Sequence, residues 1–360
     1  MGLHRTGPRR AAVLTSLAAV ALCLPASAVA QDSAPYQPVW HLEYQTPNAD
    51  AGTGLLSVTA PSKNDAWAVG TIGRKHATGY IVHWNGRHWR RVALPAYGFR
   101  PWVVNSSAPD DVWVFGTTRT GNYQVFYRSA AGWQAIPAPP VTPADQYVFG
   151  GLVVNAADVW LQSAPVLHWN GQHWQHVRLP RGFELTGFAD AGGTIWAVGL
   201  RDFSADGQGR VAVYRLHHGR WRSLAMPHRR GFIASVVADR AHSVFVSVTR
   251  QKEGFDTTVL YWNGRHWRTL PRAADAPVYF LPVAGFGAKG LWLGTNLLWN
   301  RSQWISISQH VDGQAQLVVT DEGGIAQIPG TRSSWLVMPA GTSPKRGLCG
   351  QIWVAGRLPH

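Results

Sequence analysis

Cysteine, acidic residues and long apolar runs are scarce in this sequence, and each scarcity excludes a class of protein. The chain of 360 residues has 2 cysteines, Cys23 and Cys349. Because Cys23 lies in an N-terminal segment that we expect to be removed, Cys349 is left without an internal partner. Packing must therefore hold the fold together, even in an oxidising compartment where disulfide bonds form readily.

The longest apolar run, from Ala11 to Leu24, is too short to span a membrane comfortably. Three arginines precede this run, and the small residues Ala28-Val29-Ala30 follow it. That layout predicts a cleavable secretory signal over residues 1–30, with Gln31 as the new N-terminus. We therefore expect a secreted or cell-envelope-associated protein without a membrane span, in which residues 31–360 form a single domain.

The chain has 19 acidic residues against 33 basic ones. Loss of Arg5, Arg9 and Arg10 with the signal would leave 30 basic residues. These residues are scattered, without a block of like charges and without a nucleic-acid-binding motif. The excess of positive charge favours anionic partners, such as cell-wall polymers or acidic glycans, over sequence-specific binding of nucleic acid.

One short sequence, aromatic-Trp-Asn-Gly-x-His-Trp, occurs three times. Its copies are residues 83–89, 168–174 and 261–267. Asn-Gly between aromatic-rich segments predicts a β-hairpin with a two-residue turn. In that register Trp84 faces Arg87 and His83 faces His88. A single hairpin with such an aromatic face is marginally stable in water, so we expect the copies to pack on one another.

A second element recurs upstream of each hairpin, a polar turn followed by an apolar segment centred on an aromatic residue. The centres, called anchors below, are Trp67, Trp113, Trp160, Trp196, Phe245, Trp292 and Trp335. Successive anchors are 36 to 49 residues apart, and a period of about 40–50 residues matches a four-stranded propeller blade. No helical periodicity competes with this pattern. The sequence therefore predicts an all-β protein, a seven-bladed β-propeller of four-stranded antiparallel blades.

Each period divides into four strands. In the first period they are expected at residues 55–59, 67–71, 80–84 and 88–93, from the innermost to the outermost. The last period has only three plausible strands, whereas residues 39–44 resemble an outermost strand with no blade before it. We expect this N-terminal strand to complete the last blade, because closure gives every edge a partner.

The paired elements, Asp-Val-Trp-Ala-Val-Gly followed by His-Trp-Asn-Gly-x-x-Trp, resemble the repeats of secreted bacterial β-propeller proteins of the kelch-like and WD-repeat-like group. The resemblance covers nearly the whole chain after residue 30. The Gly-His…Trp-Asp signature of WD repeats and the double glycine of kelch blades are both missing. The resemblance implies the fold and no particular activity, since propellers include binding proteins and enzymes alike.

Two sets of repeat side chains have metal-binding chemistry. The first set precedes the anchors and consists of Asp65, Asp111 and Asp158. The second consists of the pairs His83–His88 and His168–His173. The carboxylates could ring one mouth of the channel, but equivalent positions hold Thr, Ser or Gly, which favours a turn-forming role. Each histidine pair offers two ligands where a catalytic zinc uses three. No metal and no other cofactor is therefore predicted.

Aromatic and arginine residues outside the repeat positions are the better candidates for a binding site. Those that we assign to ligand binding are Tyr97, Arg100, Trp102, Tyr147, Arg230 and Tyr279. They lie in or beside the connections between blades, which open on the face where propellers usually bind ligands. Aromatic rings and arginine forks suit sugar rings and acidic groups. The alternative is that these residues, with Phe99 and Phe183, start the innermost strands and fill the core.

The sequence thus favours a non-catalytic, monomeric binding module that recognises a saccharide, an anionic envelope ligand or a protein partner. The alternative is a hydrolase or lyase of extracellular polysaccharide, with acids drawn from Asp145, Glu184, Asp190, Asp239 and Asp275. A glycosidase needs two positioned carboxyl groups, and no pair is evident. The common hydrolase, metalloprotease and phosphate-binding motifs are also missing. Convergence of two or more of those acids in the structure would favour the enzyme.

Overall fold

The computed structural model describes residues 38–47, 54–73, 77–141, 150–251, 255–272, 283–285, 290–294, 297–307, 324–338 and 350–356. They belong to one compact unit, Gln37–His360. The predicted export signal and Cys349 lie outside the described residues. Within the described ranges, no helix has the length and hydrophobicity needed to cross a membrane.

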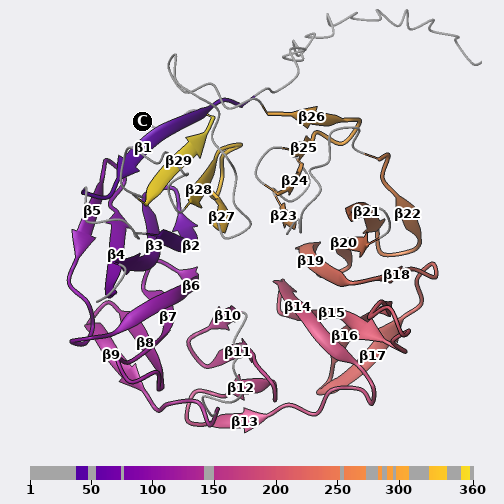
Figure 1. Ribbon diagram of the computed structural model, residues 1–360, viewed down its shortest axis with the longest axis horizontal. Coiled ribbons are helices and arrows are strands. Elements are labelled where there is room, and N and C mark those ends of the chain that lie inside the picture. The colour runs from indigo at the N-terminus through magenta and orange to yellow at the C-terminus, as the bar shows by residue number, and fades with distance from the viewer. Residues whose placement is uncertain are drawn as a thin grey trace, which may run out of the picture. The chain divides into compact units, whose positions relative to one another are not determined.

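The strands form seven antiparallel sheets, the blades of a β-propeller, as the sequence predicted (Figure 1). Blade 1 contains β2 (Gly54–Ser62), β3 (Asp65–Ile72), β4 (Thr78–Trp84) and β5 (Trp89–Val92). Blade 2 contains β6 (Arg100–Ala108), β7 (Asp111–Thr117), β8 (Tyr123–Ser129) and β9 (Gly132–Ile136). Blade 3 contains β10 (Gly150–Asn155), β11 (Asp158–Gln162), β12 (Leu167–Trp169) and β13 (Trp174–His176).

The remaining blades repeat this order. Blade 4 contains β14 (Glu184–Ala191), β15 (Thr194–Arg201), β16 (Gly209–His217) and β17 (Arg220–Leu224), and the short β18 (Arg230–Gly231) also pairs with β16. Blade 5 contains β19 (Ile233–Arg240), β20 (Ser243–Gln251), β21 (Phe255–Trp262) and β22 (Trp267–Thr269). Blade 6 contains β23 (Val283–Gly285), β24 (Leu291–Leu293), β25 (Leu297–Trp299) and β26 (Trp304–Ser306). Blade 7 contains β27 (Gly324–Gln327), β28 (Ser334–Met338), β29 (Gln351–Ala355) and β1 (Trp40–Gln45).

The innermost strands contact one another in a closed cycle. The cycle runs through β2, β6, β10, β14, β19, β23 and β27, and β27 contacts β2 again. The innermost-to-outermost order within blade 1 is the one predicted from its sequence. The blades therefore follow one another around a common axis (Figure 1).

The N-terminal strand closes the ring, as predicted. β1 is the outermost strand of blade 7 and pairs antiparallel with β29, from Trp40 opposite Ala355 to Gln45 opposite Gln351. Beyond the ladder, the Thr46 backbone N–H donates to the Gly350 carbonyl at 2.9 Å, and the Gly350 N–H donates to Thr46 Oγ1 at 2.8 Å. The first and last strands of the described chain thus share one sheet.

The anchors are the core of the blade interfaces. All seven are buried, with exposed fractions of 8% or less. Trp335 of blade 7 packs against both hairpin tryptophans of blade 1, Trp84 and Trp89, with ring centroids 5.1 Å away in each case. Trp67 of blade 1 meets Trp133 of blade 2 edge-on at 5.7 Å. Because each aromatic side chain removes about 150–250 Å² from water, no blade buries its anchor without a neighbour.

The hairpin turns are longer than the sequence predicted, and the two-residue register is wrong. Trp84 pairs directly with Trp89, so the turn comprises residues 85–88. Asn85 Oδ1 accepts hydrogen bonds from the backbone N–H groups of the two residues after Gly86, both at 3.1 Å. The asparagine side chain therefore accepts the hydrogen bonds of two N–H groups in the turn, whereas a type I′ turn would be closed by backbone hydrogen bonds alone.

This turn requires positive φ at the residue after the asparagine. The angles are 89° at Gly86, 91° at Gly171, 96° at Gly264 and 84° at Arg301. Glycine adopts this conformation without steric conflict, whereas a residue with a Cβ is strained there. Blade 6 keeps the asparagine-capped turn at Asn300 although it lacks the glycine. The turn geometry thus depends more on the asparagine than on the glycine.

Candidate functional site

The three predicted carboxylates each bind side chains of their own blade. Their contacts are Asp65 Oδ1 with His83 Nε2 (2.9 Å), Asp111 Oδ1 with Trp113 Nε1 (2.8 Å), and Asp158 Oδ1 with Trp160 Nε1 (2.7 Å) and His168 Nε2 (2.8 Å). Asp65 and Asp158 join the second strand of a blade to its third strand, and Asp111 also accepts a hydrogen bond from Ser107 Oγ on the innermost strand. Their role is structural, and these contacts use indole, imidazole and hydroxyl groups, whereas an Asx turn would use backbone N–H groups.

The histidine pairs do not face each other across the hairpins. His83 stacks on Trp67 with ring centroids 4.1 Å apart, whereas His88 lies in the turn beside Asn85. His168 stacks in the same way on Trp160 at 4.4 Å. Throughout the described ranges, no three His, Cys, Asp or Glu side chains lie close enough together to hold a metal ion.

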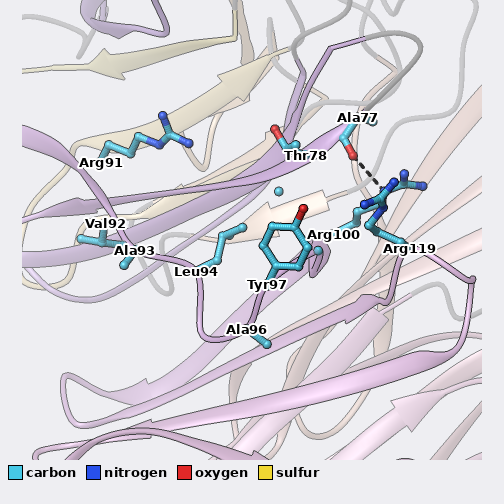
Figure 2. Close-up of a pocket in the computed structure, with 12 residues that line it drawn as sticks. Ala77, Thr78, Arg91, Val92, Ala93, Leu94, Ala96, Tyr97, Arg100 and Arg119 are labelled. Atoms are coloured by element: carbon cyan, nitrogen blue, oxygen red, sulfur yellow. Dashed lines mark hydrogen bonds between the residues drawn. The ribbon is translucent and has the colours of Figure 1, made fainter.

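A pocket of about 710 Å³ lies between blades 1 and 2 (Figure 2). It opens on the connection face, defined here as the side that carries residues 93–99, which lead from blade 1 to blade 2. The opposite side carries the asparagine-capped turns between the third and fourth strands. The residues that line the pocket are Ala77, Thr78, Gly79, Arg91, Val92, Ala93, Leu94, Ala96, Tyr97, Gly98, Arg100 and Arg119. That volume lies within the usual range for small-molecule sites.

Three arginines from three different segments reach this pocket. Arg91 belongs to β5 and lines the pocket, but its guanidinium lies 4.8 Å from the ring centroid of Tyr80, a side chain that packs against blade 7. Arg100 begins β6, and its Nε donates to the Ala77 carbonyl at 2.9 Å (Figure 2). Arg119 extends from the β7–β8 hairpin beside Gly98. Among the described residues none of the three forms an ion pair, and no lining residue is acidic.

The wall between the arginines is apolar and aromatic. Tyr97 is 95% exposed, and Figure 2 shows its ring between Leu94 and Arg100. Gly98 has a φ of 75° and thereby turns the chain sharply after Tyr97. An exposed aromatic ring on a short, turned connection is available to a ligand from the solvent side.

The structure brings two of the six predicted binding residues, Tyr97 and Arg100, into one pocket. Trp102 lies on β6 outside this pocket, half-buried, with its ring edge-on to Tyr123 at 5.6 Å. Tyr147 and Tyr279 lie outside the described residues. The two phenylalanines weighed as possible core, Phe99 and Phe183, are buried.

Arg230 lies in blade 4 and holds the long β15–β16 insert. Its Nη2 donates to the carbonyls of Asp202 (2.8 Å) and Gln208 (2.7 Å) and to Ser204 Oγ (2.8 Å). One guanidinium thus fixes both ends of the insert against the connection into blade 5. These contacts use only Nη2, so the three N–H groups on Nε and Nη1 take no part in them.

Sequence reasoning missed Arg91 and Arg119. Arg91 follows Arg90 on the outermost strand of blade 1, and Arg119 lies in the β7–β8 hairpin of blade 2. A charge signal was present, because residues 66–109 contain six basic residues and no acidic one. That signal indicates a basic segment, but only the folded chain shows which of its arginines converge.

The acids proposed for an enzyme do not converge in the described part of the chain. Glu184 is exposed at the start of β14, and Asp190 lies six residues along the same strand, roughly 20 Å away at the rise of an extended chain. Burial, and then the charge of Asp158, raise the pKa of Asp190. Asp145 and Asp275 lie outside the described residues, as does the side chain of Asp239.

By sequence, the chain matches neither a known family nor a curated protein. Solved structures match it in fold. YCF48 bound to D1 peptide is 14% identical, with a TM-score of 0.52 over 89% of this chain and 99% of that one. The BP39L lectin from Burkholderia pseudomallei is 11% identical, with a TM-score of 0.53 over 84% and 96%.

The β-propeller domain of the Trilobed protease from Pyrococcus furiosus is 9% identical, with a TM-score of 0.53 over 86% of this chain and 98% of that one. That domain has an open velcro topology, whereas β1 and β29 close the ring in the present chain. At such low identity these likenesses show the propeller fold alone.

Proposed function

We propose that this protein is a non-catalytic binding module and that an anionic ligand, carried by a saccharide or a protein partner, occupies the pocket between blades 1 and 2. The observation that carries the proposal is the presence of Arg100 and Arg119, from two segments of blade 2, in a pocket without an acidic lining residue. The structural neighbours include a lectin and a peptide-bound protein, so binding of either kind is compatible with the fold.

Electrostatics and geometry both support an anionic ligand. The guanidinium groups of Arg100 and Arg119, beside one concave and partly apolar surface, raise the local concentration of anions. Arg100 is already fixed by its hydrogen bond to the Ala77 carbonyl. Side chains held in place before binding lose less conformational entropy when the ligand arrives. Arginine forks also match carboxylate, sulfate and phosphate geometry better than lysine does.

The test is binding of carboxylated, sulfated and neutral oligosaccharides and of acidic peptides, measured by calorimetry, with product analysis on the same mixtures. Arg119→Gln is expected to weaken binding by about tenfold or more, the effect of losing a charge-assisted hydrogen bond. Arg90→Gln is the control, because Arg90 is exposed in blade 1 and does not line the pocket. Equal affinities of the two variants, or turnover of any ligand, would contradict the proposal.

The proposal also covers export of the protein and the group of propellers to which it is related. We infer that the protein is a monomer that belongs with the exported bacterial repeat propellers of the kelch-like group and meets its ligand outside the cytoplasm or at the cell envelope. The expected result is a mature form that begins at Gln31 and is recovered outside the cytoplasm, determined by N-terminal sequencing of each cell fraction. An intact N-terminus on cytoplasmic protein would contradict this part and leave the pocket proposal standing.

A further inference from the structure

Two arginines of blade 4 lie directly opposite each other near the β16–β17 turn, on the side away from the connection face. They are Arg215 on β16 and Arg222 on β17. Directly opposed residues share one face of a sheet, with Cβ atoms about 4.5–5.5 Å apart. Like charges in that relation destabilise a sheet. The surrounding chain offers no relief, because residues 207–238 contain six arginines and no acidic residue.

Blade 4 lacks the carboxylate that serves the equivalent place in blade 1. There His83 lies opposite the anchor, and its Nε2 lies 2.9 Å from Oδ1 of Asp65, two residues before the anchor. Blade 3 repeats this arrangement. In blade 4 the residue opposite the anchor Trp196 is Arg215, and Thr194 stands two residues before the anchor. The basic residue is thus retained, whereas its acidic partner is lost.

No carboxylate of the described residues pairs with either arginine. Arg215 Nη1 donates to His242 Nδ1 of blade 5 at 3.3 Å, and its guanidinium lies 5.9 Å from the ring centroid of Trp196. These contacts hold Arg215 in place without neutralising its charge. Arg222 is exposed to solvent. One positioned guanidinium and one accessible guanidinium therefore stand side by side.

Further basic side chains surround this pair. His217 follows on the same strand, with its ring centroid 4.1 Å from that of His218 in the turn, and Arg220 lies opposite His217. The pKa of His217 is lowered by burial and then by the positive charges of His218, Arg222 and Arg215. These groups therefore lie close enough to act on one another, and the site favours a ligand with more than one negative charge.

We propose that a phosphate monoester binds between Arg215 and Arg222 and supplies the negative charge that blade 4 lacks. Such a group carries about −1.5 to −2 charges at pH 7 and has three strong acceptor oxygens. A carboxylate carries a single charge and therefore balances only one of the two arginines. Arginine also binds phosphate through two parallel hydrogen bonds. This site goes beyond the proposed function and shares no residue with the pocket between blades 1 and 2.

The experiment compares three glucose derivatives that carry different anions at C6: glucose 6-phosphate, glucose 6-sulfate and glucuronate. By calorimetry at constant ionic strength, the phosphate is expected to bind at least about tenfold more tightly than the two singly charged compounds. Arg222→Gln is expected to weaken phosphate binding by about tenfold or more, because a charge-assisted hydrogen bond is lost. Arg268→Gln is the matched control, because Arg268 is exposed at the same position on the outermost strand of blade 5.

A second measurement reports on the site itself. The ring protons of His217, identified by their loss in His217→Gln, give the pKa of this imidazole by NMR titration. Bound phosphate offsets the neighbouring positive charges, so glucose 6-phosphate is expected to raise that pKa. By linkage, phosphate binding is then tighter when His217 is protonated than when it is neutral. Neither arginine substitution is expected to lower the Tm, because both side chains are exposed.

The outcomes separate this inference from the proposed function. Equal phosphate affinities of Arg222→Gln and Arg268→Gln, glucuronate binding as tight as that of the phosphate, or an unmoved pKa of His217 would each overturn it. If Arg119→Gln abolishes phosphate binding and Arg222→Gln does not, the phosphate occupies the pocket between blades 1 and 2. The proposed function then stands and this inference fails. If Arg119→Gln weakens no ligand while Arg222→Gln weakens glucose 6-phosphate, the reverse holds.

Discussion

Replacement of Trp40 by alanine tests whether the N-terminal strand contributes to global stability. Trp40 is 1% exposed on β1, opposite Ala355 of β29, and its ring lies 5.2 Å from that of Trp292 in blade 6. A tryptophan removes about 150–250 Å² from water, which corresponds to about 4–6 kcal/mol at roughly 25 cal/mol per Å². Truncations of this kind reduce the free energy of unfolding by about 3–5 kcal/mol. We expect Trp40→Ala to fall in that range.

The assay is guanidinium unfolding followed by far-ultraviolet circular dichroism and by tryptophan fluorescence. The control is Leu42→Ala on the same strand, where the side chain is 43% exposed and the expected loss is within about 0.5 kcal/mol. A loss for Trp40→Ala below about 1 kcal/mol, or no larger than that for Leu42→Ala, would refute the view that closure by β1 supports the whole ring.

Three further changes test local features by the same unfolding measurement. Arg301→Gly should raise the free energy of unfolding by about 1 kcal/mol, because it relieves a φ of 84°; no gain would mean the turn is unstrained. Gly70→Ala places a Cβ 1.8 Å from a backbone oxygen and should lower it by about 1–3 kcal/mol, whereas Gly150→Ala, with nothing within 4 Å, should not. Burial, and then the hydrogen bond to Tyr80, raise the pKa of Tyr44. The folded protein thus holds the phenol proton more tightly than the unfolded chain, so the contribution of Tyr44 is complete below about pH 10 and is lost as the pH rises further. Tyr44→Phe should flatten that alkaline loss, and an unchanged slope would contradict the assignment.

Much of the fold followed from the sequence because its determinants repeat. The anchors recur at a nearly constant interval, and the surplus strand near Trp40 matched the strand missing from the last period. The spacing of the anchors and the number of strands can both be read from the sequence without a structure. The hairpin register did not follow, because Asn85 caps the turn through its side chain. Residue type alone does not distinguish that role from a place in a two-residue turn.

The candidate site was only half accessible to sequence reasoning. Tyr97 and Arg100 were found because they stand outside the repeat in a connection. Arg91 and Arg119 were missed because the pocket forms between two blades, and no sequence pattern shows which residues line it. Arg230 occupied a similar connection, yet it binds the insert of blade 4. Position relative to the repeat thus identifies available arginines, and neighbouring segments determine their use.

The pairing of the first strand with the last has a consequence for biosynthesis. Thr46 and Gly350, which bond to each other, are separated by 304 residues, and translation at about 5–20 residues per second needs roughly 15–60 s to cross that distance. During this interval β1 has no partner strand, and its tryptophan is not yet buried. Two nascent copies in that state can exchange their N-terminal strands and form a domain-swapped dimer. Slow synthesis therefore exposes this protein to strand exchange in a way that a ring closed by local hairpins avoids.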